Sequence, residues 1–436
     1  METEIMAKPF IEKTPIRVEI ESLAHDGRGV AKIDGKVVFI EEALIGEIVE
    51  CIYQKNHKDY AEATTIKVLK AAPERVTPNC PHYGICGGCS FQHVDSKNQI
   101  EFKQQLVIEQ LYRIGKVQVT DYWLPLTDQA WNYRTKARMG VKYVEKKARV
   151  LVGFRERRQT FLAEMNSCQI MHPLIGNHLP ELAHLISQLS IKSFIPQIEV
   201  AIGDQNDCIL AIRTLKPATI EDQQLLIQFA NQYQICIALQ PKGVDSIHAL
   251  MNEKLLTPAY HLPEFNLRFE FKPAMFTQVN YAINRQMIQQ AIHALELNQN
   301  DNVLDLFCGL GNFTLPLATR AAKVIGIEGD NVLIQQAKHN AQLNQINNAE
   351  FYVADLTKPL IGNWVNQRYS KLLLDPSRAG ADKVLPYLAQ WQPEKIIYVS
   401  CNPSTLARDA GILVNDLGYR LIKVGVMDMF PQTAHV

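Results

Sequence analysis

The sequence predicts an α/β protein with a small N-terminal β-barrel, a central mixed α+β domain and a C-terminal doubly wound parallel sheet. Residues 11–70 alternate apolar and polar side chains between short turns, a pattern typical of small barrels. From about residue 271, short apolar runs alternate with helix-like segments, which indicates a parallel sheet with helices packed on it. We therefore expect domains at residues 1–72, 73–270 and 271–436.

The barrel is predicted from its turn signals, at residues 25–29 and 34–35. Pro73 and Pro78 mark its end. Residues 96–114 have apolar side chains at helical spacing, with Ser96 in front and Gly115 behind, and so predict a helix. Residues 130–270 mix strand and helix patterns.

Five short apolar runs predict the strands of the C-terminal sheet. They are NVLDLF (302–307), KVIGIE (323–328), EFYVAD (350–355), KLLLDP (371–376) and KIIYVS (395–400). Helix-like segments separate them, as in a doubly wound fold.

Charge is balanced over the whole chain, with 45 Lys+Arg and 45 Asp+Glu, but it is concentrated locally. Between Arg134 and Arg158 there are ten Lys/Arg against Glu145 and Glu156. The stretch is either a solvated sheet face or strands with one basic face, which would suit a polyanion.

No apolar run approaches the ~20 residues that a membrane helix needs, and the N-terminus lacks the apolar core of a secretion signal. We therefore expect a cytoplasmic protein with no membrane association, and no obligate protein partner is evident. Disulfides are rare in that compartment, so the nine cysteines need another explanation.

Residues 302–318 predict a strand, a glycine turn and a helix. Gly309 and Gly311 allow a ligand to approach the backbone. Glu328, at the end of the next strand, is placed to bind a ribose diol, and Asp355 follows the strand after that, within reach of an adenine edge. The short turn and Asp305 favour S-adenosylmethionine over NAD.

Four elements of this region resemble the RNA uracil-carbon-5 methyltransferases: DLFCGLGNF, Glu328, DPSRAG and SCNPSTLARD. The resemblance implies a class I (Rossmann-like) methyltransferase domain that binds S-adenosylmethionine. It also implies cofactor contacts from Gln278, Phe307 and Asn312, beside those of Glu328 and Asp355. Asp375 would lie near both the sulfonium and the target base, as a catalytic and cofactor-binding residue.

Cys401 follows the last predicted strand, where open α/β sheets bind their ligands. Uracil carbon-5 is a poor nucleophile, and addition of a thiolate to carbon-6 activates it. The alternative is a buried, inert thiol. Its position and flanking motif favour Cys401 as the nucleophile.

Cys80, Cys86 and Cys89 have the spacing C-x5-C-x2-C, which predicts a zinc or iron–sulfur site. The spacing also resembles the branch of the family that modifies 23S ribosomal RNA. That resemblance implies a 4Fe–4S cluster in the central domain, with Cys168 as fourth ligand, and an N-terminal TRAM-like (OB-like) barrel that binds RNA. The remaining four cysteines are interpreted as packing residues: Cys51, Cys208, Cys236 and Cys308.

The chain ends with FPQTAHV at Val436. In the family this segment is followed by a glutamate, the proposed base for the carbon-5 proton, and by a last strand. The sequence therefore predicts a C-terminally shortened protein that forms the covalent adduct but resolves it poorly, and it predicts an exposed sheet edge.

Together these features predict an enzyme that makes 5-methyluridine in 23S ribosomal RNA. Three alternatives remain. One is the same reaction at a different uracil, and another is a non-catalytic RNA-binding protein that keeps the barrel and the cluster. The third is a zinc-stabilised adapter protein, which would be colourless where an iron–sulfur protein is brown.

Overall fold

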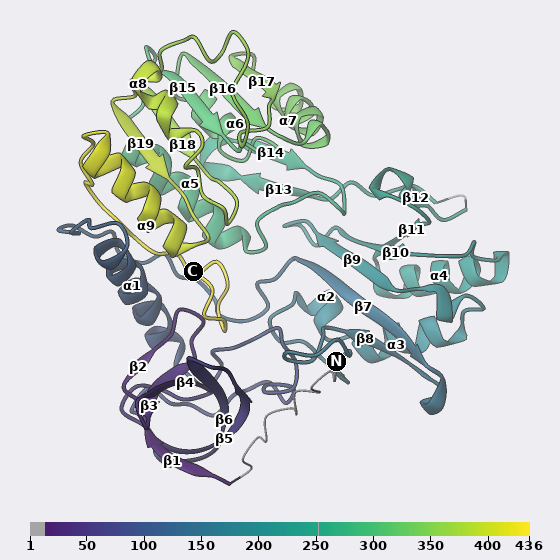
Figure 1. Ribbon diagram of the computed structural model, residues 1–436. Coiled ribbons are helices and arrows are strands. Elements are labelled where there is room, and N and C mark those ends of the chain that lie inside the picture. Colours follow the sequence, from purple (N-terminus) through teal and green to yellow (C-terminus); the bar gives the residue numbers. More distant parts are fainter. Residues whose placement is uncertain (1–13, 252) are drawn as a thin grey trace, which may run out of the picture. The chain divides into compact units, whose positions relative to one another are not determined.

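The computed structural model describes residues 14–251 and 253–436 (Figure 1). Its contacts divide the chain into two compact units. The first contains the residues up to Lys103 together with Phe430–His435, and the second contains Gln104–Met429 and Val436. No helix in the described ranges is long and apolar enough to cross a membrane.

A six-stranded sheet forms the first unit, in the order β1-β5-β6-β4-β3-β2. Its strands are β1 (Ile16–Glu19), β2 (Ser22–Leu23), β3 (Gly29–Ile33), β4 (Lys36–Glu41), β5 (Ile48–Asn56) and β6 (Tyr60–Lys70). Figure 1 shows this sheet curling into a barrel. Small and branched side chains fill the interior, among them Ala31, Val38, Ile40 and Ala63. The predicted barrel is confirmed.

The second unit begins within α1 (Ser96–Arg113) and continues into a six-stranded sheet of order β12-β11-β10-β9-β7-β8. Its strands are β7 (Lys136–Val144), β8 (Arg149–Gly153), β9 (Gln197–Ile202), β10 (Cys208–Arg213), β11 (Cys236–Gln240) and β12 (His248–Ala249). Its helices are α2 (Pro173–Gly176), α3 (Leu179–Gln188) and α4 (Ile220–Tyr233).

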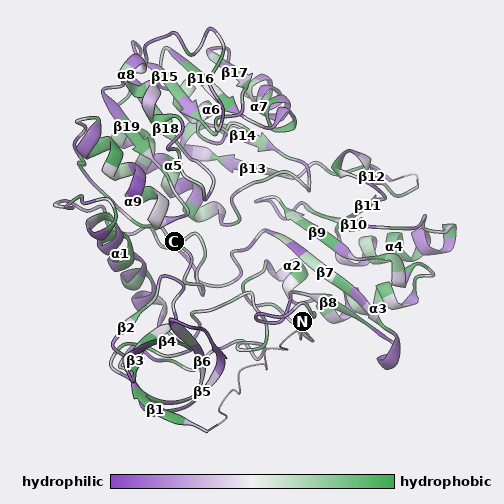
Figure 2. Cartoon of the chain, viewed as in Figure 1, coloured by the Kyte–Doolittle hydropathy of each residue, from purple (hydrophilic) through white to green (hydrophobic). Residues whose placement is uncertain are grey.

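Along β7, hydrophobic and hydrophilic residues alternate (Figure 2). Ala137, Met139 and Val141 are buried, whereas Arg138 and Lys142 are exposed. The alternation follows from the two-residue period of a strand. Arg138 and Lys142 therefore lie on the solvent side of β7, which agrees with a basic face and equally with a solvated sheet face.

A parallel five-stranded sheet follows, in the order β17-β16-β15-β18-β19. Its strands are β15 (Asn302–Leu306), β16 (Lys323–Glu328), β17 (Ala349–Val353), β18 (Lys371–Leu374) and β19 (Lys395–Tyr398). All five lie at the predicted positions. The runs at 350–355, 371–376 and 395–400 leave the sheet two residues early, and the run at 302–307 leaves it one residue early.

The helices of this region are α5 (Tyr281–Leu295), α6 (Thr314–Ala318), α7 (Asn331–Leu343), α8 (Leu388–Trp391) and α9 (Pro403–Gly411). The hairpin of β13 (Ala259–Leu262) and β14 (Leu267–Glu270) precedes them. From β15 the chain runs outward through β16 to β17 and then returns to β18 on the other side of β15. The order of the strands reverses between β15 and β18, which is where open α/β sheets bind ligands.

Candidate active site

Four predicted site residues follow four neighbouring parallel strands. Phe307 follows β15, Glu328 ends β16, Asp375 follows β18 and Cys401 comes three residues after β19. Parallel strands have their carboxyl ends at one edge of the sheet. The backbone N–H of Asp375 donates to the Leu306 carbonyl at 3.3 Å, which places Asp375 beside the end of β15.

The turn after β15 has an unusual backbone. Phe307, Gly309 and Gly311 have φ of +67°, +57° and +94°, values that favour glycine. For Phe307 this conformation is strained, and such strain is concentrated at functional sites. The turn is therefore shaped for close approach of a ligand to its backbone.

Glu328 is held by backbone N–H groups on both sides of the edge. Its carboxylate accepts from Gly309 at 3.1 Å, from Gly329 at 2.7 Å and from Asp330 at 3.1 Å. These bonds fix the carboxylate beside the glycine turn. The arrangement suits an acceptor for the two hydroxyls of a ribose.

Two more carboxyl groups share this electrostatic environment. Burial raises the pKa of Asp305 to about 8, against the effect of the Thr314 hydroxyl, which donates to its carboxyl at 2.5 Å. Burial and the charge of Glu328 raise the pKa of Asp375 to about 7. A cationic ligand would stabilise the ionised forms of these groups, and the sulfonium of S-adenosylmethionine is such a ligand.

Cys401 is half-buried and directly precedes Asn402, the N-cap of α9. The Asn402 side chain accepts from the Ser404 N–H at 3.1 Å and donates to the Arg378 carbonyl at 2.9 Å. The thiol thus lies at the positive end of a helix, which stabilises nearby negative charge. It also lies beside the loop that carries Asp375.

Three further predicted residues occupy different environments. Gln278 is half-buried in the segment before α5. Asn312 is half-buried in the glycine turn after β15, called the cofactor turn below, and the side chains of Tyr260 and Asn284 bind its amide. Asp355 is exposed, and hydrogen bonds from Thr357 and Lys358 lower its pKa to about 2. Its carboxylate is engaged locally, so its contact with an adenine stays a prediction.

A family model described as tRNA (Uracil-5-)-methyltransferase matches residues 126–436. The chain belongs to this family. A second model, the TRAM domain, matches residues 13–66, which agrees with the barrel of the first unit. Together the two models cover most of the chain, as the resemblance of the motifs predicted.

Curated relatives match over nearly the full length. The chain is 48% identical over 423 residues to the 23S rRNA (uracil(1939)-C(5))-methyltransferase RlmD of Methylococcus capsulatus, covering 97% of this chain and 95% of that protein. It is 45% identical to the protein of the same name from Legionella pneumophila, covering 98% and 97%.

Among solved structures, the fold is similar to the tRNA (uracil-54, C5)-methyltransferase of Pyrococcus abyssi in complex with S-adenosyl-L-homocysteine. The TM-score is 0.72 at 23% identity, and the match covers 96% of this chain and 98% of that one. This similarity establishes the fold of the family for this chain.

The four cysteines assigned to the cluster are divided between the two units. Cys80, Cys86 and Cys89 belong to the first unit and Cys168 to the second. Cys86 and Cys168 are buried, and the Gly88 N–H donates to the Cys86 sulfur at 3.4 Å. In the described parts of the chain, no three His, Cys, Asp or Glu residues form a group that could hold a metal ion.

Of the other four cysteines, Cys51, Cys208 and Cys308 are buried and Cys236 is half-buried. Burial raises the pKa of Cys51 to about 11 and raises the pKa values of Cys208, Cys236 and Cys308. A thiol with a raised pKa is a poor nucleophile at neutral pH. These thiols therefore do not compete with Cys401 as candidate nucleophiles.

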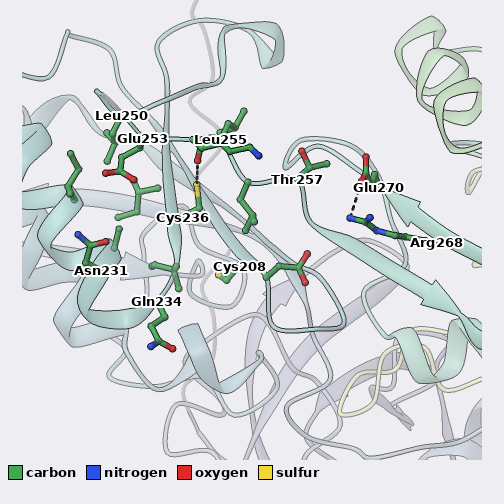
Figure 3. A pocket seen from close by; sticks show the side chains of 17 residues that line it. Cys208, Asn231, Gln234, Cys236, Leu250, Glu253, Leu255, Thr257, Arg268 and Glu270 are labelled. Atoms are coloured by element: carbon green, nitrogen blue, oxygen red, sulfur yellow. Dashed lines mark hydrogen bonds and ion pairs between the residues drawn. The ribbon is translucent and has the colours of Figure 1, made fainter. Parts of the chain in front are cut away.

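A cavity of about 620 Å³ lies in the second unit, lined mainly by residues of α4 and β11 and by Leu250 and residues 253–257, which come after β12 (Figure 3). Cys208, Cys236, Glu253 and Arg268 are among its lining residues. None of the predicted site residues lines it. We therefore assign the active site to the carboxyl edge of the parallel sheet and not to this cavity.

Sequence reasoning missed the residues that hold the cofactor turn from outside. Tyr260 donates to Asn312 at 2.7 Å, and Asn284 shares two hydrogen bonds with it. Neither residue lies in a recognisable motif. They are 52 and 28 positions from Asn312, so only the fold reveals the contacts.

Proposed function

We propose that this protein transfers the methyl group of S-adenosylmethionine to carbon-5 of a uracil in 23S ribosomal RNA. The observation that carries the proposal is the placement of Asp375 and Cys401 after the adjacent strands β18 and β19, at the same carboxyl edge of the sheet as Glu328 and the glycine turn after β15. The names of the full-length relatives support ribosomal RNA as the substrate. A ribosomal substrate also fits a cytoplasmic protein.

S-adenosylmethionine supplies an electrophilic methyl group. The Cys401 thiolate adds to uracil carbon-6, and the electron pair of the carbon-5–carbon-6 double bond moves to give an enolate-like carbon-5. Carbon-5 forms a bond to the methyl carbon as the carbon–sulfur bond of the sulfonium breaks. A base then removes the carbon-5 proton, and the electron pair left at carbon-5 expels the Cys401 thiolate.

The remaining site residues would bind and orient. We propose that Gln278, Phe307, Asn312, Glu328 and Asp355 contact the cofactor. Asp375 would contact both the cofactor and the uracil edge, which must leave any base stack to react. The TRAM barrel and the basic face of β7 would bind the RNA backbone. The three domains would then be the barrel at residues 1–72, the central domain at residues 73–270 and the methyltransferase domain at residues 271–436.

We further propose that Cys80, Cys86, Cys89 and Cys168 hold a 4Fe–4S cluster with a structural role. Thiolates are the ligands that such clusters need, and N–H···S hydrogen bonds such as that of Gly88 accompany them. The test is iron and sulfide analysis of anaerobically purified protein, with Cys168→Ala beside Cys236→Ala. Bound zinc without iron would contradict the proposal.

The reaction is tested with unmodified 23S RNA and S-adenosylmethionine labelled in the methyl group. Label is expected in free RNA or in a protein–RNA adduct on a denaturing gel. Cys401→Ala should abolish both, whereas the control Cys236→Ala should keep them. Mass spectrometry of RNA fragments then locates the uracil and separates the proposal from the same reaction at another site.

Two results would overturn the proposal. One is the absence of label from RNA although the wild-type protein is folded and binds S-adenosylmethionine, which would favour a non-catalytic RNA-binding protein. The other is methylation by Cys401→Ala at the wild-type rate, which would exclude Cys401 as nucleophile.

A further inference from the structure

The Asn312 side chain in the cofactor turn is bound by two residues from other elements. Its Oδ1 accepts from the Tyr260 hydroxyl at 2.7 Å and from the Asn284 amide at 3.1 Å. Its Nδ2 donates to Asn284 Oδ1 at 2.9 Å. Tyr260 is 3% exposed and Asn284 is 1% exposed. Both residues that bind Asn312 are therefore shielded from water.

The position of the Tyr260 hydroxyl is fixed by its buried ring, which stacks against two other aromatic rings. The ring centroids of Phe269 and Tyr281 lie at 4.9 Å and 5.3 Å, with interplanar angles of 3° and 20°. Phe269 is also the cross-strand partner of Tyr260 in the β13–β14 hairpin. Burial raises the pKa of Tyr260, so the hydroxyl keeps its proton and remains available as a donor.

The same hairpin supports the turn at a second point. Asn340 of α7 donates to the Leu310 carbonyl at 3.3 Å, and its Oδ1 accepts from the Glu270 N–H at 3.0 Å. Glu270 is the last residue of β14. The hairpin therefore supports the turn through Tyr260 at Asn312 and through Asn340 at Leu310.

The hydrogen bonds of the Asn312 side chain leave one N–H of its amide to bind a ligand. An asparagine amide has two N–H groups and one oxygen that accepts up to two hydrogen bonds. Here the oxygen accepts two bonds and one N–H is donated to Asn284. A single N–H remains for an acceptor such as a carboxylate oxygen of the cofactor.

We propose that Tyr260 and Asn284 are positioning residues that set the orientation of the Asn312 amide for S-adenosylmethionine. This inference rests on the proposed function, since it assigns the cofactor to this turn. Neither residue touches the reacting atoms. Both act through Asn312, so their effect is on cofactor affinity and on KM for the cofactor, with little effect on KM for RNA.

The test is a double-mutant cycle on the full chain, read by isothermal titration with S-adenosylmethionine and with S-adenosylhomocysteine. Tyr260→Phe removes one hydroxyl and is expected to raise Kd about 5- to 10-fold. In the Asn312→Ala background the same change should alter Kd less than about twofold, because the residue it acts through is gone.

Tyr281→Phe is the matched control. Tyr281 belongs to the same aromatic stack, but its hydroxyl donates to the Ile202 carbonyl at 2.8 Å and not to the cofactor turn. It should leave Kd unchanged while destabilising the fold to a similar degree in urea. Asn284→Ala removes both amide bonds to Asn312 and should weaken binding more than Tyr260→Phe.

Three outcomes would overturn the inference. They are an unchanged Kd in Tyr260→Phe, the same loss in the Asn312→Ala background, and an equal loss in Tyr281→Phe. If the folded wild-type protein does not bind S-adenosylmethionine at all, the proposed function fails first and the inference falls with it.

Discussion

The polar residues that follow Cys401 bind the protein itself. Asn402 and Thr405 both donate to the Arg378 carbonyl, at 2.9 Å and 3.3 Å. These bonds fasten the loop that carries Asp375 to the first turn of α9. They keep Asp375 and Cys401 on elements whose relative position is fixed, which a reaction between bound groups requires.

Asp409 completes this attachment from inside the helix. Its buried carboxylate accepts from the Ala381 N–H at 2.7 Å, the Tyr398 hydroxyl at 2.6 Å and the Arg408 Nε at 2.7 Å. Three charge-assisted bonds to one buried group are strong and specific. Asn402, Thr405 and Asp409 of the motif around Cys401 therefore have a structural role.

Asp375 gives a prediction about pH. With a pKa of about 7, it is mostly neutral below that pH and ionised above it. The sulfonium cation favours the ionised form, so the Kd for S-adenosylmethionine should fall about tenfold between about pH 6 and pH 8. Titration calorimetry of the wild-type protein and Asp375→Asn measures this change, and a smaller change is expected for the variant, in which Asp305 still titrates in the same region of pH.

The same group has the opposite effect on stability. Its ordinary pKa is 3.8, so between pH 3.8 and about 7 the folded state holds a proton that the unfolded chain has lost. The contribution of Asp375 to the free energy of unfolding therefore falls as pH rises through that window. An Asp375→Asn protein with the wild-type pH dependence of cofactor affinity would contradict the assignment.

Lys136 gives a prediction about stability. Its ammonium is buried without a hydrogen-bond partner among the described residues, 5.6 Å from the centroid of the Phe271 ring, and burial lowers its pKa to about 8. Lys136→Met should raise the free energy of unfolding at pH 7 by roughly 1–3 kcal/mol. Urea unfolding measures the difference.

The direction in which the free energy of unfolding changes with pH provides a second check on Lys136. Between about pH 8 and pH 10.5 the unfolded chain holds a proton that folded Lys136 has lost, so the wild-type protein should gain stability as pH rises through that range. Lys142→Met, which changes an exposed lysine of the same strand, should change stability by less than about 0.5 kcal/mol. A destabilised Lys136→Met protein would exclude this interpretation.

At the scale of elements, the segment Phe430–His435 packs in the first unit although it is last in the sequence. Gln99 and Gln432 are buried and exchange two hydrogen bonds, at 3.1 Å and 2.9 Å. The Gln432 carbonyl accepts from the backbone of Ser90 and Phe91, directly after Cys89. The terminal segment thus supports the end of the cysteine loop, which comprises residues 80–89.

Gln99→Ala should therefore destabilise the first unit by about 2–3 kcal/mol, because it leaves buried polar groups of Gln432 unpaired. Hydrogen exchange should show the loss in residues 430–435 and in the cysteine loop. Gln105→Ala, exposed on the same helix α1, is the matched control. Unchanged exchange in residues 430–435 would count against the role of this pair.

At the scale of the whole molecule, three of the predicted cluster ligands and the predicted cofactor ligands lie in different units. Iron removal with a chelator should therefore destabilise residues 80–89 in the first unit and the segment around Cys168 in the second. The Kd for S-adenosylmethionine should stay within about twofold, because Glu328, Asp375 and the glycine turn belong to the second unit. A tenfold loss of cofactor affinity on chelation would contradict this separation.

The sequence by itself determined the barrel, the five parallel strands and the positions of Glu328, Asp375 and Cys401. These depend on local patterns: the period of a strand, glycines at positive φ, and polar residues directly after apolar runs. Each is set by neighbours within a few residues. The family motifs then related this pattern to uracil methylation.

Only the tertiary structure decided which groups act together. The raised pKa of Asp375 depends on burial and on Glu328, 47 positions earlier in the chain. The hydrogen bonds of Tyr260 and Asn284 to Asn312, and the packing of residues 430–435 in the first unit, join parts of the chain that share no local pattern. Burial and long-range hydrogen bonds depend on the folded neighbours of a residue, which its local sequence does not specify.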